Sequence, residues 1–331
     1  MSLNPKIYLN PEVFNTAKLD QKPTRDGYGQ GLVVAGEADK NVVVLCADLT
    51  ESTRSLYFKQ KFPERFVQFG VSEQSMAAIA AGMAMAGKIP FISSYAAFSP
   101  GRNWEQIRTN ISLNDLNVKI GGAHAGISVG PDGATHQAIE DIATMRVLAK
   151  MTVLAPCDMI EARKATVAAA NWPGPVYLRF AREKSPIFTT EKTPIKIGQA
   201  EIMHLGSDVA IIACGPLLHE ALLAAHELAK KGISARVINN HTIKPMDERT
   251  IIAAAKECGA VVTVEEHQVM GGLGSAVAEV LVKNYPVPLE FIGVQNHFGE
   301  SGEPRELLEA FKMTAPQILA AVKKVLKRKQ R

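Results

Sequence analysis

The sequence predicts an α/β protein of two domains, each a mostly parallel sheet covered by helices. Short runs rich in Val and Ile alternate with helical patterns along most of the chain, and these runs are apolar throughout. Strands of a parallel sheet are buried on both faces, so continuous apolar runs separated by helices are typical of such a sheet. The length of 331 residues exceeds one typical domain and suits two.

The first half of the chain supplies three predicted strands and two predicted helices. The strands are Asn41–Cys46, Asn117–Gly121 and Met151–Leu154. An Ala- and Met-rich segment, Ser72–Gly87, predicts a helix with Ser72 as its cap, and Asp158–Ala170 predicts another. Residues 1–24 have weak periodicity and are expected to form an arm.

A change of composition at Ser185–Lys196 predicts an interdomain linker, because this segment is rich in Pro, Thr and Lys. The alternation then restarts. The predicted elements of the second half are the strands Asp208–Cys214, Ala235–Ile238 and Ala260–Val264 and the helices Leu217–Lys231 and Leu273–Asn284. We therefore divide the chain into a first domain over residues 1–190, which includes the arm, and a second over 191–331.

The composition narrows the class of protein. Hydrophobic residues make up 47% and charged residues 21%, the balance of an ordinary globular protein. No apolar run approaches the ~20 residues that span a bilayer, and no leader pattern is present, so we expect no membrane contact. The net charge of +4 is concentrated in Lys323–Arg331, which is expected to be a solvated helix end that binds no nucleic acid.

The cysteines indicate a reduced, cytoplasmic protein. Cys46, Cys157, Cys214 and Cys258 lie far apart, and no CxxC pair occurs. Neither a zinc site nor a disulfide framework is therefore predicted, and no metal ligand is assigned to this chain.

One carboxylate lies at the start of the Ala- and Met-rich helix, which is otherwise uncharged. In GVSEQSM, Glu73 follows a strand and occupies the first helical turn. The helix dipole favours a carboxylate there, so this segment alone predicts no more than a helix-start residue.

A glycine-rich loop is harder to explain as structure alone. Residues 123–137 read AHAGISVGPDGATHQ and contain His124, Asp132 and His136. The loop follows a strand, so it lies at the carboxyl edge of the sheet, where open α/β sheets bind ligands. Singly, each histidine would be structural. Two imidazoles and a carboxylate in one such loop favour a polar substrate site.

Several basic and hydroxyl side chains are candidates for binding phosphate, although each alone suits a surface role. Arginine suits phosphate because its fork donates two parallel hydrogen bonds. The candidates are Arg25, Ser52, Thr53, Arg179 and Arg182. The other glycine-rich turn, Gly271–Gly274, departs from the GxGxxG spacing and predicts close helix–strand packing.

Taken together, these stretches resemble the transketolase family of thiamine-diphosphate enzymes. The resemblance runs from Arg25 to the C-terminus through TRDG, VVVLCADLTEST, FGVSEQSMAAIAAGMAMAG, PFISSYAAF, AHAGISVGPDGATHQ and YLRFAREKSP. The ADLTxS and GxDGxTHQ loops are the most specific pieces. The first domain is similar to the family's pyrimidine-binding domain, and the second to its C-terminal domain.

A piece of the family pattern is absent. The family holds the diphosphate and its magnesium with GDG followed by Asn, and no GDG occurs in this sequence. The resemblance therefore implies the C-terminal section of a split transketolase. It would be active only with a partner chain that supplies the magnesium ligands, as a heterotetramer of two copies of each chain. The implied reaction is transfer of a two-carbon ketol unit from a ketose phosphate to an aldose phosphate, in the pentose phosphate pathway.

The resemblance also implies roles for individual residues. Glu73 matches the glutamate that contacts N1′ of the aminopyrimidine, and Tyr95 and Phe98 match positions that pack on that ring. Asp48 matches an aspartate near the cofactor interface. The remaining matches concern the sugar: His124 and His136 around the donor, Asp132 at a hydroxyl, and Arg25, Ser52 and Arg182 at the phosphate.

Departures from the pattern keep alternatives open. Gln74 stands where many transketolases carry histidine, and the first histidine lies in AHAG. Both features lean toward 1-deoxyxylulose-5-phosphate synthase. The beta subunit of a 2-oxoacid dehydrogenase also pairs two such domains with a separate chain, but the phosphate-binding set argues for a sugar phosphate. A non-catalytic scaffold with an inherited fold is the third alternative.

Overall fold

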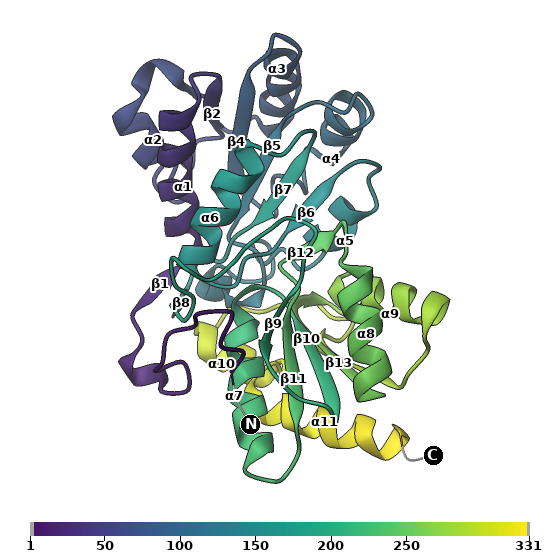
Figure 1. The fold of residues 1–331 in the computed structure, drawn as a ribbon. Coiled ribbons are helices and arrows are strands. Elements are labelled where there is room, and N and C mark those ends of the chain that lie inside the picture. The colour runs from purple at the N-terminus through teal and green to yellow at the C-terminus, as the bar shows by residue number, and fades with distance from the viewer. Residues whose placement is uncertain (1–2, 330–331) are drawn as a thin grey trace.

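The computed structural model describes residues 3–329, and the chain forms two stacked α/β halves (Figure 1). The first half occupies the upper part of the view and the second half the lower part. Both ends of the chain lie on the lower half. The last two residues of the predicted basic tail lie outside the described residues, and its helical part ends at Lys329.

The upper half is built on a seven-stranded sheet with the strand order β12-β6-β7-β5-β4-β2-β3. Every pair is parallel except β12 with β6. Its strands are β2 (Val42–Cys46), β3 (Phe66–Gln68), β4 (Ile89–Tyr95), β5 (Lys119–Ala123), β6 (Thr152–Leu154), β7 (Val176–Arg179) and β12 (Thr242–Lys244). The associated helices are α1 (Thr24–Ala38), α2 (Leu56–Lys61), α3 (Glu73–Met85), α4 (Trp104–Gln106), α5 (Asp141–Arg146) and α6 (Met159–Ala170).

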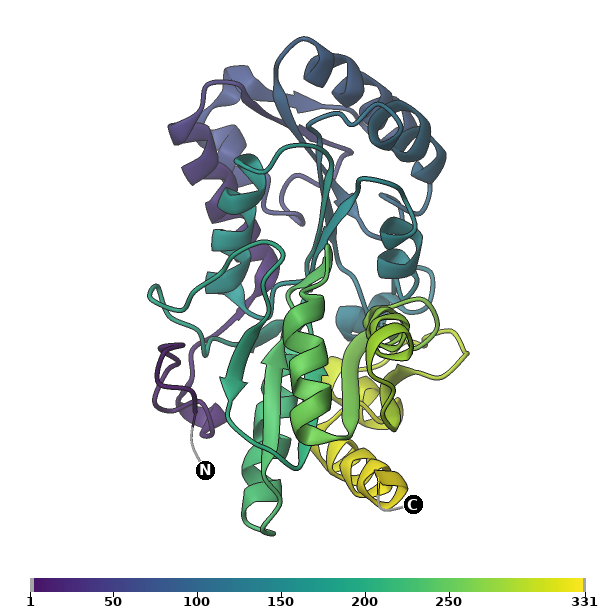
Figure 2. The ribbon, with the colours of Figure 1, turned by 45° about the vertical axis from the view of Figure 1, so that its right-hand side comes forward.

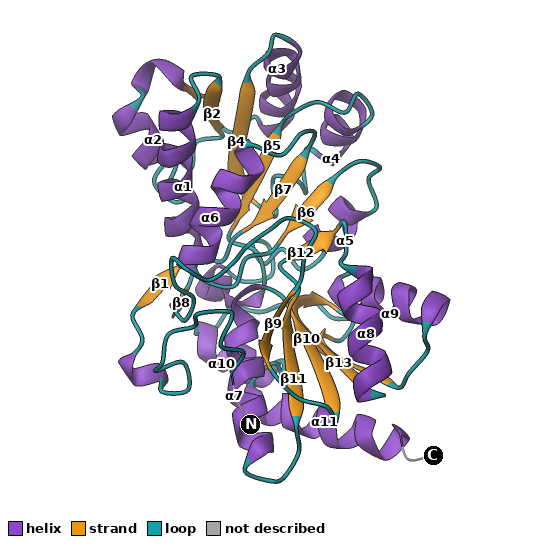
Figure 3. Cartoon of the chain, viewed as in Figure 1, coloured by secondary structure: helices purple, strands orange, loops and turns teal. Residues whose placement is uncertain are grey.

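The lower half contains a five-stranded sheet with the order β14-β13-β10-β11-β9, in which only β9 is antiparallel to its neighbour (Figure 3). Its strands are β9 (Glu201–His204), β10 (Val209–Ala213), β11 (Ala235–Asn239), β13 (Val261–Gln268) and β14 (Leu289–Val294). Its helices are α7 (Leu218–Ala229), α8 (Glu248–Cys258), α9 (Leu273–Asn284), α10 (Pro304–Ala310) and α11 (Ala315–Lys329). The predicted fold class is confirmed.

The predicted elements are present with small shifts of their ends. The Ala/Met-rich helix begins at Glu73, but Ser72 does not cap it, because its hydroxyl donates to the carbonyl of Phe69 at 2.7 Å. Asp158 does cap α6, accepting the N–H of Glu161. The predicted linker begins with a short strand, β8 (Lys184–Pro186), which pairs with β1 (Gln21–Pro23) of the arm.

The two halves share structure at their junction, which Figure 2 shows from a second side. The strand β12 comes from the second half of the sequence yet completes the first sheet by pairing with β6. The arm, conversely, packs on the lower half: Ile7, Val13 and Leu19 join the core that α7 and α11 cover. A continuous apolar core therefore crosses the junction, and the boundary near residue 190 stays a prediction.

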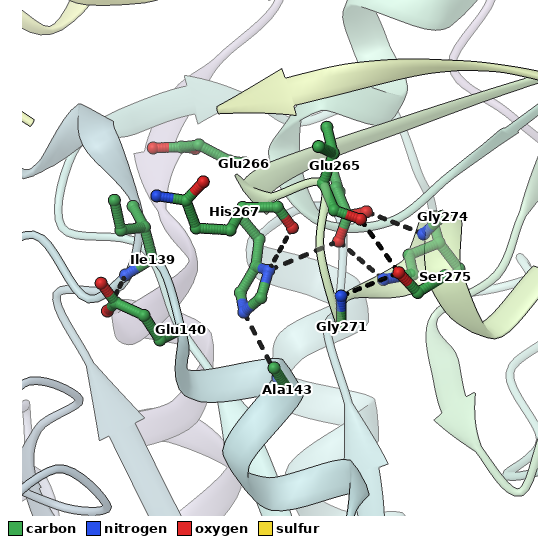
Figure 4. A network of polar contacts seen from close by, with 12 residues as sticks. Ile139, Glu140, Ala143, Glu265, Glu266, His267, Gly271, Gly274 and Ser275 are labelled. Atoms are coloured by element: carbon green, nitrogen blue, oxygen red, sulfur yellow. Dashed lines mark hydrogen bonds and ion pairs between the residues drawn. The ribbon is translucent and has the colours of Figure 1, made fainter. Parts of the chain in front are cut away.

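A buried polar network lies at the same junction (Figure 4). The carboxylate of Glu265 on β13 accepts the backbone N–H groups of Leu273 at 2.6 Å and Gly274 at 2.7 Å, at the start of α9. The ring of His267 accepts the N–H of Ala143 from α5 at 3.3 Å. A Cβ at Gly272 would lie 2.0 Å from the Glu265 carboxylate. The turn Gly271–Gly274 thus packs closely on a strand, as predicted.

Candidate active site

The carboxyl edge of the seven-stranded sheet gathers most of the predicted site residues. Tyr95 ends β4, His124 follows β5, and Arg182 follows β7. Ser52 lies in the loop after β2. Parallel strands present their carboxyl ends at one edge, which is why residues so far apart in the sequence meet.

Glu73 is buried at the start of α3, with 1% of its side chain exposed. One carboxylate oxygen accepts the hydroxyl of Ser94 at 3.3 Å, and the other accepts Nη1 of Arg102 at 2.7 Å. Asn103 donates to the backbone carbonyl of Glu73 at 3.1 Å. The carboxylate therefore faces side chains of β4 and of the segment that follows it rather than solvent.

Four rings form a cluster next to Arg102, the partner of this carboxylate. Tyr95 stacks on His124 with 3.8 Å between ring centroids and on Phe98 with 5.9 Å. His136 meets Phe98 edge-on at 5.4 Å, so the glycine-rich loop closes over the aromatic pair. The guanidinium of Arg102 lies 4.8 Å from the Phe98 centroid and links the rings to Glu73. The structure thus brings Glu73, both aromatics and both histidines into one site.

His124 is held neutral by its surroundings. Burial, followed by the positive charges of Arg25 and Arg182, lowers the pKa of the ring far below its ordinary value. Its Nε2 lies 3.2 Å from Nη1 of Arg25. Because a guanidinium only donates, Nε2 is the acceptor and Nδ1 carries the proton. Among the described residues, this buried Nδ1 has no hydrogen-bond partner.

Arg25, at the start of α1, connects the histidine to the loop after β2. Its Nη1 also donates to the carbonyl of Ser52 at 2.9 Å. Burial, then the nearby charge of Arg54, lowers the pKa of Arg25. Arg54 is a residue that the sequence reasoning missed, and it forms an ion pair with Asp26 at 2.6 Å. A group of three arginines, Arg25, Arg54 and Arg182, therefore surrounds His124.

Arg182 and Asp132 face one another across the mouth of the site. Their charged groups are 3.7 Å apart, with 30% and 34% of the two side chains exposed. Arg182 also donates to the carbonyl of Val129 at 2.6 Å. This carbonyl belongs to η4 (Ile127–Asp132), so Arg182 both supports the loop and presents a positive charge at its edge.

The second domain holds the glycine-rich loop from behind. Glu266 of β13 accepts the N–H of Ser128 at 2.5 Å. Gln137 donates to the carbonyl of Glu300 at 2.9 Å. Gly126 has φ +91°, and a Cβ there would lie 2.4 Å from the Glu266 carboxylate. The loop that carries Asp132 and His136 is thus shaped by contact with the other domain.

Two candidates lie apart from this cluster. Arg179 is buried and pairs with Asp141 at 2.8 Å, and it also donates to the carbonyl of Glu266. Its guanidinium is committed to the domain junction, so the phosphate role considered for it is wrong. Asp48 is exposed after β2 and accepts Nε2 of Gln68 at 3.0 Å; its role at the cofactor interface stays a prediction.

The sequence reasoning did not assign Arg102 or Glu266. Arg102 had one available signal, a lone cation close after the aromatic run YAAF. Glu266 had none, because its contact with Ser128 spans 138 positions of the chain. Among residues 3–329, no group of three His, Cys, Asp or Glu side chains is placed to hold a metal ion.

Two family models match this chain. Residues 20–186 match the transketolase pyrimidine-binding domain, and residues 198–318 match the transketolase C-terminal domain.

In the part of the chain that the structure describes, no helix has the length and apolar character to cross a membrane.

Individual relatives agree with the family models. A Methanocaldococcus jannaschii protein named "Putative transketolase C-terminal section" is 44% identical over 93% of this chain and 97% of its own length. A Clostridium protein named "6-deoxy-6-sulfo-D-fructose transketolase subunit SqwH" is 41% identical over 94% of this chain and 97% of its own length. A structure described as "Split gene transketolase, inactive beta4 tetramer" superposes with a TM-score of 0.87 at 45% identity, covering 93% of this chain and 99% of that one. With matches to both of its domain models and relatives of this similarity, the chain belongs to the transketolase family.

Proposed function

We propose that this chain is the cofactor-activating subunit of a two-chain transketolase that uses thiamine diphosphate and magnesium. The observation that carries the proposal is the placement of Glu73. Its buried carboxylate pairs with Arg102, whose guanidinium lies over Phe98, the ring on which Tyr95 stacks, at the same sheet edge as His124, His136 and the arginines. An aminopyrimidine needs this combination, an acid at a ring nitrogen and flat apolar faces.

The residues present fit the pyrimidine end of the cofactor. Glu73 would hold a proton at N1′, and the aromatic pair would orient the ring. The unpartnered Nδ1 of His124 supports a polar group in this space. When bound, thiamine diphosphate supplies the electron sink for the two-carbon unit. Magnesium prefers phosphate oxygens with one or two carboxylates, and we assign those ligands to the partner chain.

The sugar would lie between the loop and the arginine group. Arg25 and Arg182, with Ser52 nearby, supply positive charge and hydrogen-bond donors for its phosphate. Asp132 would accept a sugar hydroxyl. His124, neutral and protonated on Nδ1, would donate to the carbonyl oxygen, and His136 would take part in proton transfer at the opposite side.

The partner is an N-terminal section that carries the diphosphate domain, in a heterotetramer of two plus two chains. Relatives with nearly the same length as this chain are named as a C-terminal section and as a subunit, which supports a divided enzyme. The tetramer described as inactive supports dependence on a partner. We place the protein in the cytoplasm, within the pentose phosphate pathway; its four cysteines are buried and free.

The experiment is reconstitution with the N-terminal section. The co-purified complex, given thiamine diphosphate and magnesium, should transfer two-carbon units between ketose and aldose phosphates, while the chain alone should not. The donor panel should include 6-deoxy-6-sulfo-D-fructose, because a relative is named for that sugar. Turnover only with pyruvate as donor would indicate the synthase alternative, and a requirement for a lipoyl acceptor would indicate the dehydrogenase alternative. Absence of any cofactor binding by the complex would indicate a scaffold.

A further inference from the structure

Both oxygens of the Glu73 carboxylate already have partners within this chain. Ser94 donates to one and Arg102 to the other, and 1% of the side chain is exposed. Because only 1% of the side chain is exposed, a ring nitrogen reaches this carboxylate only when one of the donors that cover it moves aside. The question is which of them can leave.

The two donors differ in freedom. Ser94 is fully buried in β4, where its neighbours on both sides are strands of the same sheet. Arg102 comes from the segment between β4 and α4, and 47% of its side chain is exposed. A long side chain with half its surface in solvent can swing away without disturbing the core, whereas the serine cannot. Arg102 is therefore the donor that yields.

Arg102 also lies over the ring of Phe98, which is the second group that the cofactor ring would contact. Its guanidinium lies 4.8 Å from the centroid of Phe98 while Nη1 donates to Glu73. A planar donor thus lies over the aromatic ring and hydrogen-bonds the carboxylate at the same time. These are the two contacts proposed above for the aminopyrimidine.

We propose that Arg102 is a latch on Glu73, which occupies the place of the aminopyrimidine ring until the cofactor displaces it. This inference rests on the proposed function. A buried carboxylate without a counter-charge destabilises a protein, so the ion pair lets this chain keep Glu73 in place before the cofactor arrives. Binding of the cofactor then exchanges one planar donor for another, and Arg102 moves into solvent.

The first test measures the latch in the chain alone, by a double-mutant cycle on denaturant unfolding. The variants are Arg102→Met, Glu73→Gln and the double variant. Arg102→Met should lower the folding equilibrium constant about ten- to a hundredfold, because a charge-assisted bond to a buried carboxylate is lost. In the Glu73→Gln background the same change should have less than a threefold effect. Equal losses in both backgrounds would contradict the pairing.

Arg108→Met is the matched control for this cycle. Arg108 is exposed, lies six positions along the chain, and forms no ion pair among the described residues. It undergoes the same chemical change, so its effect should be small and independent of Glu73. A coupling as large as that of Arg102 would show that the cycle reports general charge loss.

The second test measures thiamine diphosphate binding to the complex with the N-terminal section, by titration calorimetry. Arg102→Met should tighten binding about tenfold, because the cofactor no longer competes with the guanidinium, and Arg102→Lys should stay closer to the parent. Damage to the site would weaken binding, so tighter binding separates a latch from a structural role. Unchanged or weaker binding would overturn the proposal.

The outcomes separate the latch from the function on which it rests. If the parent complex binds thiamine diphosphate but Arg102→Met binds it no more tightly, only the latch is wrong. If the parent complex binds no thiamine diphosphate, the proposed function is wrong, and the latch toward this cofactor falls with it.

Discussion

Two glutamates, Glu73 in the first domain and Glu265 in the second, are equally buried but differ in the partners that donate hydrogen bonds to their carboxylates. Each is 1% exposed, but Glu73 is the first residue of α3, whereas Glu265 lies on β13 and its carboxylate reaches the start of α9. Glu265 accepts two backbone N–H groups of α9, at 2.6 and 2.7 Å (Figure 4). Glu73 accepts only side chains, and one of them, Arg102, is half in solvent.

The two carboxylates differ in whether a ligand can replace one of their hydrogen-bond donors. Backbone donors at a helix start are fixed by the helix itself, so Glu265 cannot change partners without unwinding a turn. A carboxylate held by a mobile side chain can accept a ligand in its place. Burial alone therefore does not identify a functional carboxylate, whereas the nature of its partners does. The predictions below test this distinction.

The largest expected effect is on Glu73→Gln in the assembled enzyme. The amide keeps the shape but cannot hold or return a proton at N1′. Exchange of the thiazolium C2 proton with deuterium, followed by NMR, and overall turnover should both fall by roughly 10²–10⁴. Partner binding should be kept. A variant that exchanges and turns over like the parent would leave Glu73 a helix-start residue only.

Glu265→Ala should give the opposite result, a loss of stability with little loss of chemistry. Two buried N–H groups at the start of α9 would lose their acceptor, which corresponds to about 2–3 kcal/mol in the free energy of unfolding. Urea unfolding of the chain measures this loss. The C2 exchange rate per folded enzyme should stay within about threefold of the parent. A hundredfold drop in the C2 exchange rate would show that Glu265, like Glu73, is needed for the chemistry.

Arg182→Ala tests the same distinction, between a group available to a ligand and a group that only supports the structure, for a positively charged side chain. Arg182 has one backbone partner and a loose pair with Asp132, so its guanidinium is available to a ligand. We expect the KM for phosphorylated substrates to rise about ten- to a hundredfold, since a charge-assisted hydrogen bond is lost. The KM for glycolaldehyde, which has no phosphate, should change far less. Equal losses on both would show that Arg182 only supports the loop.

The smallest expected effect is a change in the pH dependence of stability. Burial raises the pKa of Glu265 to about 7, above its ordinary value of 4.5. Between these values the folded chain holds a proton that the unfolded chain has lost, so stability falls as pH rises through this window. One such group contributes a slope of at most about 1.4 kcal/mol per pH unit.

Glu265→Gln should flatten this part of the profile, measured as unfolding free energies at pH 5, 6, 7 and 8. Glu161 is also buried with its pKa raised to about 7, so the parent and the variant must be compared by difference. Glu227→Gln is the control and should leave the slope unchanged, because the hydrogen bond from Lys230 lowers the pKa of Glu227 and so keeps its titration below this window. A variant slope equal to that of the parent would contradict the assignment.

Most of the fold could be predicted because its elements are local patterns. The apolar runs became β2, β5, β6, β10, β11 and β13, and Leu273–Asn284 formed a helix with its predicted bounds. What was missed depends on contacts between distant segments. The strand β12 pairs across the domain junction, and the arm packs on the second domain. Periodicity within one segment cannot indicate which sheet that segment will join.

The sequence by itself determined the family, the order of the elements and the residue types at the site. Motifs such as SEQ and GxDGxTHQ lie within a few positions and can be recognised without coordinates. Only the tertiary structure decided which charged groups remain available to a ligand. Arg179 and Arg182 are three positions apart, yet one is committed to Asp141 at the junction and the other faces the site. The reason is physical: the partners of a charged group come from other strands and helices, and its own neighbours in the sequence do not specify them.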